Sequence, residues 1–195
     1  MKFRDSGMPD ETMWKTFFSP ESILHELEID TRVDTFIDIG CGYGTFLFPA
    51  SKLVKNAIGI DIDHQMIAYC EGLIQRENYK NIELIAGDIS TSDTLTPLKP
   101  FPGNADYVTL FNILHCEKPG VLLESVYRLL KPGGKLGVIH WTYSNTPRGP
   151  ALEIRPKPEQ IIEWAENAGF TLSKRVDLPP YHYGIVFIKP KGENI

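Results

Sequence analysis

The chain has 195 residues, of which 42% are hydrophobic and 23% are charged, and this composition is typical of a globular protein with one core. The net charge of −5 offers no broad basic surface to a phosphate backbone, so we expect no nucleic-acid partner. No run of about 18 apolar residues and no signal-like apolar segment is present, so we expect a cytoplasmic protein without a membrane span. Cys41, Cys70 and Cys116 match neither a zinc site nor a disulfide framework, which favours reduced thiols and no bound metal.

The first half of the chain alternates helical and strand patterns after an N-terminal helical segment. Apolar, β-branched runs predict buried strands, and apolar residues at a spacing of three or four predict helices. The predicted elements are a helix beginning near Pro20, a strand over 33–39, a helix over 45–54, a strand over 56–60, a helix over 64–75 and a strand over 81–86.

The second half continues the alternation and ends on two strands. The predicted elements are a loop over 90–104, a strand over 105–111, a helix over 119–130, a turn over 131–134, a strand over 135–141, a helix over 158–168 and strands over 170–176 and 183–188. Alternating strands and helices predict a mostly parallel sheet covered on both faces. The last two strands lack a helix between them, which predicts a hairpin and an antiparallel final strand.

A glycine-rich turn follows the first predicted strand. Gly40, Gly42 and Gly44 allow the backbone to turn tightly and approach a ligand closely. A dinucleotide fingerprint requires a third glycine at the position of Thr45, so a nicotinamide-dependent dehydrogenase is disfavoured. In an α/β sheet the ligand is expected beyond the carboxyl ends of the strands, where the strand order reverses.

Five segments in this order carry a resemblance to a known family. They are Asp38–Gly44 with the spacing GxGxG, Ile60-Asp61, Ala86–Ile89, Ala105–Asn112 and Leu129–Leu136. Together they resemble the class I S-adenosylmethionine-dependent methyltransferases. The resemblance implies an α/β fold that is a three-layer α/β/α sandwich with a mostly parallel, seven-stranded Rossmann-like sheet and an antiparallel last strand.

The same resemblance implies S-adenosyl-L-methionine as the cofactor and assigns its binding residues. Asp61 corresponds to the acid that accepts hydrogen bonds from the ribose hydroxyls, and Asp88 to the acid that meets the adenine amino group. The residues expected to bind the cofactor are Asp38, Gly40, Cys41, Gly42, Gly44, Asp61, Ile62, Asp88, Ile89 and Asn112. An ordinary α/β domain with acids at its strand ends is the competing interpretation.

Methyl transfer needs an in-line approach in a water-poor site, and a catalytic base is not obligatory. His115 follows the fourth predicted strand and is the candidate base near neutral pH, unless it makes only a structural hydrogen bond. The candidate acceptor-binding residues, which alternatively pack at the sheet edge, are His140, Trp141, Tyr143, Arg148 and Tyr181.

We expect a single domain over 1–195, in which 31–195 form the core and 1–30 form a helical lid. Trp14, Phe17 and Phe18 either fold over the cofactor or simply pack beside the first helix. The expected function is methyl transfer to a small-molecule acceptor, leaving S-adenosylhomocysteine. A sensor or partner subunit that binds the cofactor without turnover is the second hypothesis, and a rim unable to seat an acceptor would favour it.

Overall fold

A computed structural model describes residues 11–90 and 103–192 of the chain. Its central sheet has the order β3-β2-β1-β4-β5-β7-β6. The strands are β1 (Thr35–Ile39), β2 (Asn56–Asp61), β3 (Ile82–Ala86), β4 (Ala105–Phe111), β5 (Leu130–Trp141), β6 (Thr171–Leu178) and β7 (His182–Ile188). Pairing is parallel from β3 through β5, and β7 runs antiparallel between β5 and β6. The predicted mostly parallel, seven-stranded sheet with an antiparallel last strand is confirmed.

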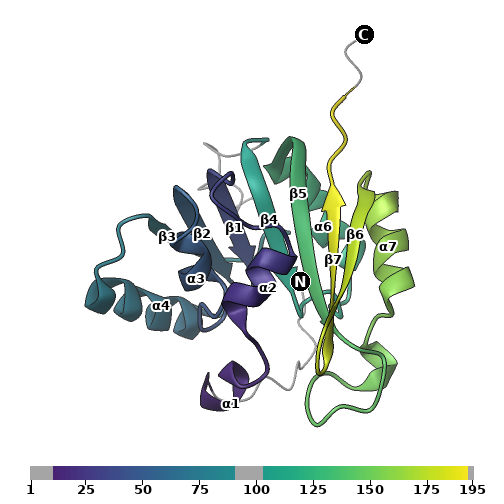
Figure 1. Cartoon of the computed structure of the whole chain (residues 1–195), viewed down its shortest axis with the longest axis horizontal. Coiled ribbons are helices and arrows are strands. Elements are labelled where there is room, and N and C mark those ends of the chain that lie inside the picture. The colour runs from purple at the N-terminus through teal and green to yellow at the C-terminus, as the bar shows by residue number, and fades with distance from the viewer. Residues whose placement is uncertain (1–10, 91–102, 193–195) are drawn as a thin grey trace.

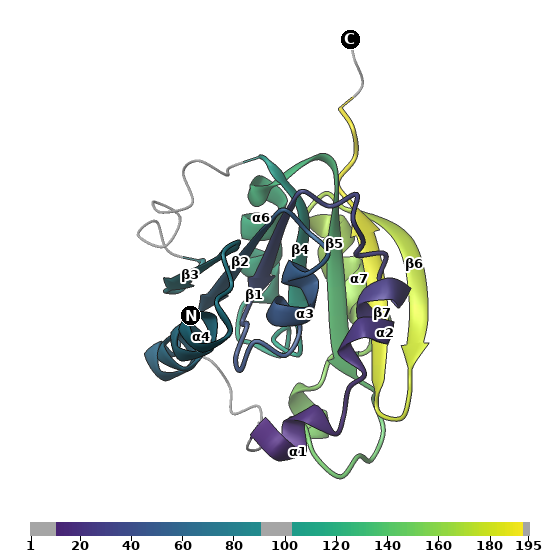
Figure 2. The same ribbon diagram turned by 60° about the vertical axis from the view of Figure 1, so that its left-hand side comes forward.

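Helices cover both faces of the sheet, which makes the predicted three layers (Figures 1 and 2). The helices are α1 (Glu11–Lys15), α2 (Pro20–Glu26), α3 (Leu47–Ser51), α4 (His64–Glu77), α6 (Pro119–Leu129) and α7 (Pro158–Asn167). Apolar residues of α2, α3 and α4 form one core cluster with the sheet, and those of α6 and α7 form the other. Each face therefore buries its own apolar layer against the largely apolar central strands.

Two local features differ from the sequence-based expectation. α3 covers only Leu47–Ser51 because Pro49 has no N–H to donate to the Thr45 carbonyl, which delays the regular helix. β5 begins at Leu130 rather than at 135, since Leu130 is already extended and pairs with Ala105 before the chain bulges. Most of the predicted loop over 90–104 lies outside the described residues.

The strand order reverses between the neighbouring strands β1 and β4, because β2 and β3 lie on one side of this pair and β5 lies on the other. The carboxyl ends of the parallel strands lie at the lower edge in Figure 1, where α1 and the long connection after β5 also lie. This edge is therefore where a ligand is expected.

In the part of the chain that the structure describes, no helix is long and apolar enough to cross a membrane.

Candidate functional site

The glycine loop after β1 turns across the end of β2. The N–H groups of Gly40 and Cys41 both donate to the carbonyl of Ile60, over 2.7 and 3.1 Å. Gly44 has φ +74°, and a Cβ there would clash with the Phe48 ring. Both the left-handed backbone and the close approach of Phe48 therefore require glycine at position 44.

Asp61, at the end of β2, holds this loop in place. Its Oδ2 accepts a hydrogen bond from the Gly42 N–H over 2.8 Å, and its Oδ1 accepts one from the Asp63 N–H over 2.9 Å. Burial raises the pKa of Asp61, although these backbone hydrogen bonds oppose the shift. A single carboxylate thus fixes the glycine loop and the turn into α4.

Asp38 lies beneath the same loop and is 2% exposed. The hydroxyl of Thr109, its register partner on β4, donates to Asp38 Oδ1 over 2.7 Å. Burial raises the pKa of Asp38 to about 7, helped by the charge of Asp61 and opposed by the Thr109 hydrogen bond. Asp38 is therefore a buried acid poised to change charge near neutral pH.

A cavity of about 380 Å³ opens at this edge of the sheet and brings most of the predicted site residues together. The predicted residues that line it are Asp38, Gly40, Cys41, Gly42, Asp61, Ile62, Asn112, His115 and Trp141. Gly44 is absent from the lining of this cavity and lines a separate hollow with Tyr69 and Tyr79. The size falls within the range typical of small-molecule sites.

A narrow crevice adjoins the cavity and contains the other two predicted cofactor residues. Asp88 and Ile89 line it, and it shares Gly40, Asp61 and Ile62 with the cavity. Its volume is about 30 Å³, room for a water or two, so apolar side chains there must move to admit a flat ring.

The candidate base His115 contacts a second buried histidine. His115 Nδ1 lies 3.4 Å from His140 Nε2, and the two rings meet edge to face with their planes 78° apart. Burial lowers the pKa of His140 well below its ordinary value, so this ring is neutral. His140 thus contacts His115 and does not line the cavity itself.

The other predicted acceptor-binding residues occupy different places on the rim. Tyr181 lies against Trp141, with ring centroids 6.2 Å apart, but is not part of the cavity lining. Tyr143 and Arg148 are exposed and line two shallow hollows of the connection after β5. The structure therefore brings only Trp141 of this group to the cavity.

Several lining residues were not predicted as site residues. They are Tyr43, Thr45, Phe46, Asp63, Met66, Phe111 and Ile113, and the cavity is also lined by Trp14, which was predicted only as part of a lid. Phe111 and Ile113 flank Asn112 in the fourth motif, so their neighbours in the sequence were a usable signal. The sequence gives no such signal for Phe46, because a buried aromatic residue beside a helix start usually belongs to the core.

Comparison with known proteins assigns the family. A family model described as a methyltransferase domain matches residues 30–169, and the chain belongs to this family. The crystal structure of an S-adenosylmethionine-dependent methyltransferase from Aquifex aeolicus has the same fold, with a TM-score of 0.80 at 24% identity, over 92% of this chain and 94% of that chain. The resemblance to class I methyltransferases, whose cofactor is S-adenosylmethionine, is thereby confirmed.

Two relatives illustrate different acceptors within this similarity. The demethylmenaquinone methyltransferase of Lactococcus lactis is 27% identical over 118 residues, 58% of this chain and 44% of the relative. The 23S rRNA uracil methyltransferase RlmD of Haemophilus influenzae is 30% identical over 86 residues, 40% of this chain and 20% of the relative. The chain thus spans less than half the length of these relatives.

The residues at the site fit S-adenosylmethionine. Asn112 is buried at φ +57°, and within the described part of the chain neither of its amide atoms has a hydrogen-bond partner. The hydroxyl of Thr45 is buried and unpartnered in the same sense. Because buried polar groups normally have partners, these atoms indicate a polar ligand beside the buried Asp38 carboxylate.

Proposed function

We propose that the protein transfers the methyl group of S-adenosylmethionine to a small-molecule acceptor and releases S-adenosylhomocysteine. One observation carries this proposal: a single cavity joins the glycine loop and Asp61 to an aromatic end that contains His115 and Trp141. A protein that only held the cofactor would need no lined space beyond the loop. The cavity therefore supports turnover over the alternative of a binding subunit.

Each group has a distinct task in this proposal. The bound cofactor supplies an electrophilic methyl group on a sulfonium. Asp38 faces the positively charged methionine end, and Asp61 accepts hydrogen bonds from the ribose. Ile62 and Ile89 provide apolar surface for the adenine, with Asp88 as the polar contact. The aromatic end of the cavity excludes water and holds the acceptor in line, which lowers the barrier for the transfer.

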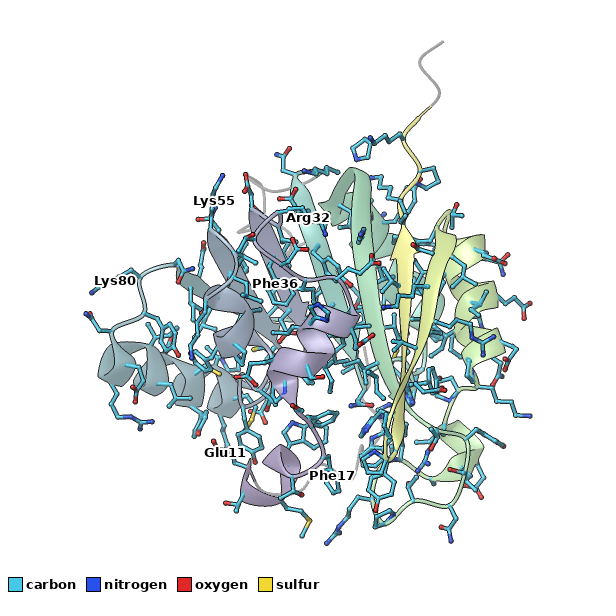
Figure 3. The ribbon with its side chains drawn as sticks, in the orientation of Figure 1. Glu11, Phe17, Arg32, Phe36, Lys55 and Lys80 are labelled. Atoms are coloured by element: carbon cyan, nitrogen blue, oxygen red, sulfur yellow. The ribbon has the colours of Figure 1, made fainter. Side chains whose placement is uncertain are left out.

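A small acceptor is favoured over RNA, even though one relative modifies rRNA. Among the described residues that line the cavity there is no lysine or arginine, and the whole chain carries a net charge of −5. Arg32 and Lys55, which Figure 3 labels, lie at the opposite edge of the sheet from Phe17 and α1. RNA binding normally requires a basic surface next to the site.

The proposed role of His115 gives the first prediction. Incubation of the protein with S-adenosylmethionine and a panel of small acceptors should release S-adenosylhomocysteine, measured by liquid chromatography. His115→Ala should lower turnover by about 10²-fold, the usual contribution of a positioned base, while cofactor affinity measured by calorimetry stays the same. His25→Ala, an exposed histidine on α2, is the control. Unchanged turnover in His115→Ala would leave this residue a structural role.

We further propose that 1–30 belong to the same domain as the core and close over the cofactor. Of this segment, residues 1–10 lie outside the described part. Trp14 lines the cavity, and the ring of Phe17 lies 5.5 Å from that of Trp141 and 6.1 Å from that of Tyr181. These contacts hold the turn after α1 against Trp141 at the end of β5, and Figure 3 shows Phe17 beside α1.

This lid gives the second prediction. Phe17→Ala should release the segment from Trp141 and weaken cofactor binding by roughly threefold to tenfold, because about 1 kcal/mol of ring contact is lost. Met13→Ala removes an exposed apolar side chain from α1, four residues before Phe17, and should leave the affinity as it is. Calorimetric titration of both variants makes the comparison, and equal affinities would relegate Phe17 to packing.

A further inference from the structure

The chemistry of the cavity bears on the identity of the acceptor, an inference that rests on the proposed function. Carboxylates line the side of the cavity next to β1 and β2, and aromatic rings line the side next to β4 and β5. The carboxylates are those of Asp38, Asp61 and Asp63, and the rings are those of Trp14, Phe46, Phe111 and Trp141, with one further ring, Tyr43, in the glycine loop after β1. A charged half and an apolar half thus lie within one cavity.

The aromatic half is held rigidly by a second layer of rings. Phe18 lies 4.9 Å from Trp14 and 5.2 Å from Phe46, measured between centroids. His182 lies 4.6 Å from Phe18 and 4.2 Å from Trp141. Both second-layer rings are buried and support the lining rings from behind. Such a preformed wall favours a flat aromatic ligand, since little side-chain freedom is lost on binding.

The charges around the cavity select against an anionic acceptor. None of the described residues that line it is a lysine or an arginine, whereas three are aspartates. A carboxylate or phosphate would lose its water beside like charges and gain no counter-ion there. A cation would also lose its water at the aromatic half of the cavity, so the favoured acceptor is uncharged.

The polar group at the aromatic half is the imidazole of His115, which is 5% exposed and lies against neutral His140. Among the uncharged groups that an aromatic ring carries, a hydroxyl is the one that an imidazole can deprotonate. A phenol is a weak acid whose proton a neutral imidazole can take as methyl transfer proceeds, whereas an aromatic amine is a far weaker acid.

We propose that the methyl acceptor is an uncharged, planar aromatic compound whose ring lies between Trp14 and Trp141 and whose hydroxyl group lies at His115. The hydroxyl oxygen forms the new bond to the methyl carbon while the carbon–sulfur bond breaks and its electron pair goes to sulfur. The hydroxyl proton passes to the imidazole of His115 and then to water. The products are an aromatic methyl ether and S-adenosylhomocysteine.

The test compares three naphthalene compounds that share one ring system and differ in charge. Calorimetry on the full chain saturated with S-adenosylhomocysteine measures the binding of 2-naphthol, 2-naphthoate and 2-naphthylmethylammonium. We expect the affinity for 2-naphthol to exceed that for either charged compound by about tenfold or more, a difference set by desolvation of the charge. Equal or tighter binding of a charged compound, or no binding of 2-naphthol, would overturn the proposal.

Tryptophan variants locate the ring. Trp14→Leu and Trp141→Leu should each weaken 2-naphthol binding about fivefold or more, through loss of aromatic contact. Trp164→Leu, which changes a half-buried tryptophan of α7 on the other face of the sheet, should not weaken it. Because Trp14 lies on the short surface helix α1, Trp14→Leu keeps the test valid if Trp141→Leu fails to fold. Unchanged affinity in Trp14→Leu would contradict the assigned position.

Turnover is measured separately, as S-adenosylhomocysteine released from S-adenosylmethionine in the presence of 2-naphthol. Release with formation of 2-methoxynaphthalene is the expected result. If 2-naphthol stays unmodified while a non-aromatic acceptor is methylated, the proposed acceptor class is wrong. If no acceptor is methylated, the proposed function fails, while the binding order of the three compounds still decides the chemistry of the cavity.

Discussion

Asp61→Ala is expected to weaken the binding of S-adenosylmethionine by roughly 10- to 100-fold, the range for the loss of charge-assisted hydrogen bonds. Two effects combine in this variant. The ribose loses its carboxylate acceptor, and the Gly42 N–H loses the 2.8 Å hydrogen bond that holds the glycine loop against β2. The loop then samples other conformations, so part of the binding energy is spent on ordering it.

Calorimetric titration with S-adenosylmethionine tests this prediction, with Asp34→Ala as the matched control. Asp34 is an exposed aspartate at the opposite end of the strands, where it pairs with Lys55, so its removal makes the same change in net charge. The control should bind like the natural protein. The affinity of Asp61→Asn should lie between those of Asp61→Ala and the control. Its amide oxygen accepts one of the two backbone hydrogen bonds, while its NH₂ group faces the other donor. An unaltered affinity in Asp61→Ala would remove Asp61 from the site.

Local patterns predicted the strands well because the central ones are buried on both faces. Ile58 and Ile60 of β2 and Val108 and Leu110 of β4 are all nearly inaccessible, and such continuous apolar runs need no knowledge of the neighbouring strands. Motif order then placed the acids at the carboxyl ends of β1, β2 and β3. Because β1 and β2 pair in parallel, their carboxyl ends lie at one edge of the sheet, and this brings Asp38 and Asp61 to the same cavity.

The contacts across the sheet were beyond the sequence. Thr109 reads as one polar residue in an apolar strand, and only the register of β1 with β4 places its hydroxyl on Asp38. Likewise, His140 was predicted as an acceptor-binding residue because it ends a strand, but the side chain faces His115. The sequence separation of 71 residues in the first case and 25 in the second carries no periodic signal.

The placement of Tyr143 and Arg148 away from the cavity has a similar cause. Both lie in the connection between β5 and α7, whose path is set by Arg155. The guanidinium of Arg155 donates to the carbonyls of Thr142, Ser144 and Pro150 over 2.6–3.2 Å, which folds the connection back on itself. A loop ordered by one of its own arginine side chains cannot be traced from turn residues alone.

The second large effect comes from the Asp38 carboxyl, whose ionisation lowers the stability of the cofactor-free protein and strengthens cofactor binding. Its pKa is about 7 in the folded protein, against about 4 for an unfolded aspartate. Between these values the folded state binds more protons than the unfolded state, so the free energy of unfolding falls as the pH rises. From pH 5 to pH 8 this group alone should remove about 2–3 kcal/mol from the stability of the cofactor-free protein.

Asp38→Asn removes this titration and keeps an oxygen that accepts the Thr109 hydrogen bond. Urea unfolding of the cofactor-free protein should therefore show the variant more stable than the natural protein by about 4 kcal/mol at pH 8 and by only about 1.5 kcal/mol at pH 5. Asp34→Asn, with its carboxyl at the surface, should follow the natural protein throughout. If the free energy of unfolding changed equally with pH in Asp38→Asn and in the natural protein, the conclusion that Asp38 is neutral below pH 7 would be refuted.

Binding should move in the opposite direction to stability. The positively charged methionine end favours the ionised form of Asp38, so the natural protein should bind S-adenosylmethionine more tightly at pH 8 than at pH 6, by about tenfold or less. Asp38→Asn should bind weakly at both pH values, because it offers the ligand no charge in a site shielded from water. The unfavourable burial of Asp38 in the free protein is then relieved by the ligand that needs its charge, which explains why so buried a strand position carries an acid.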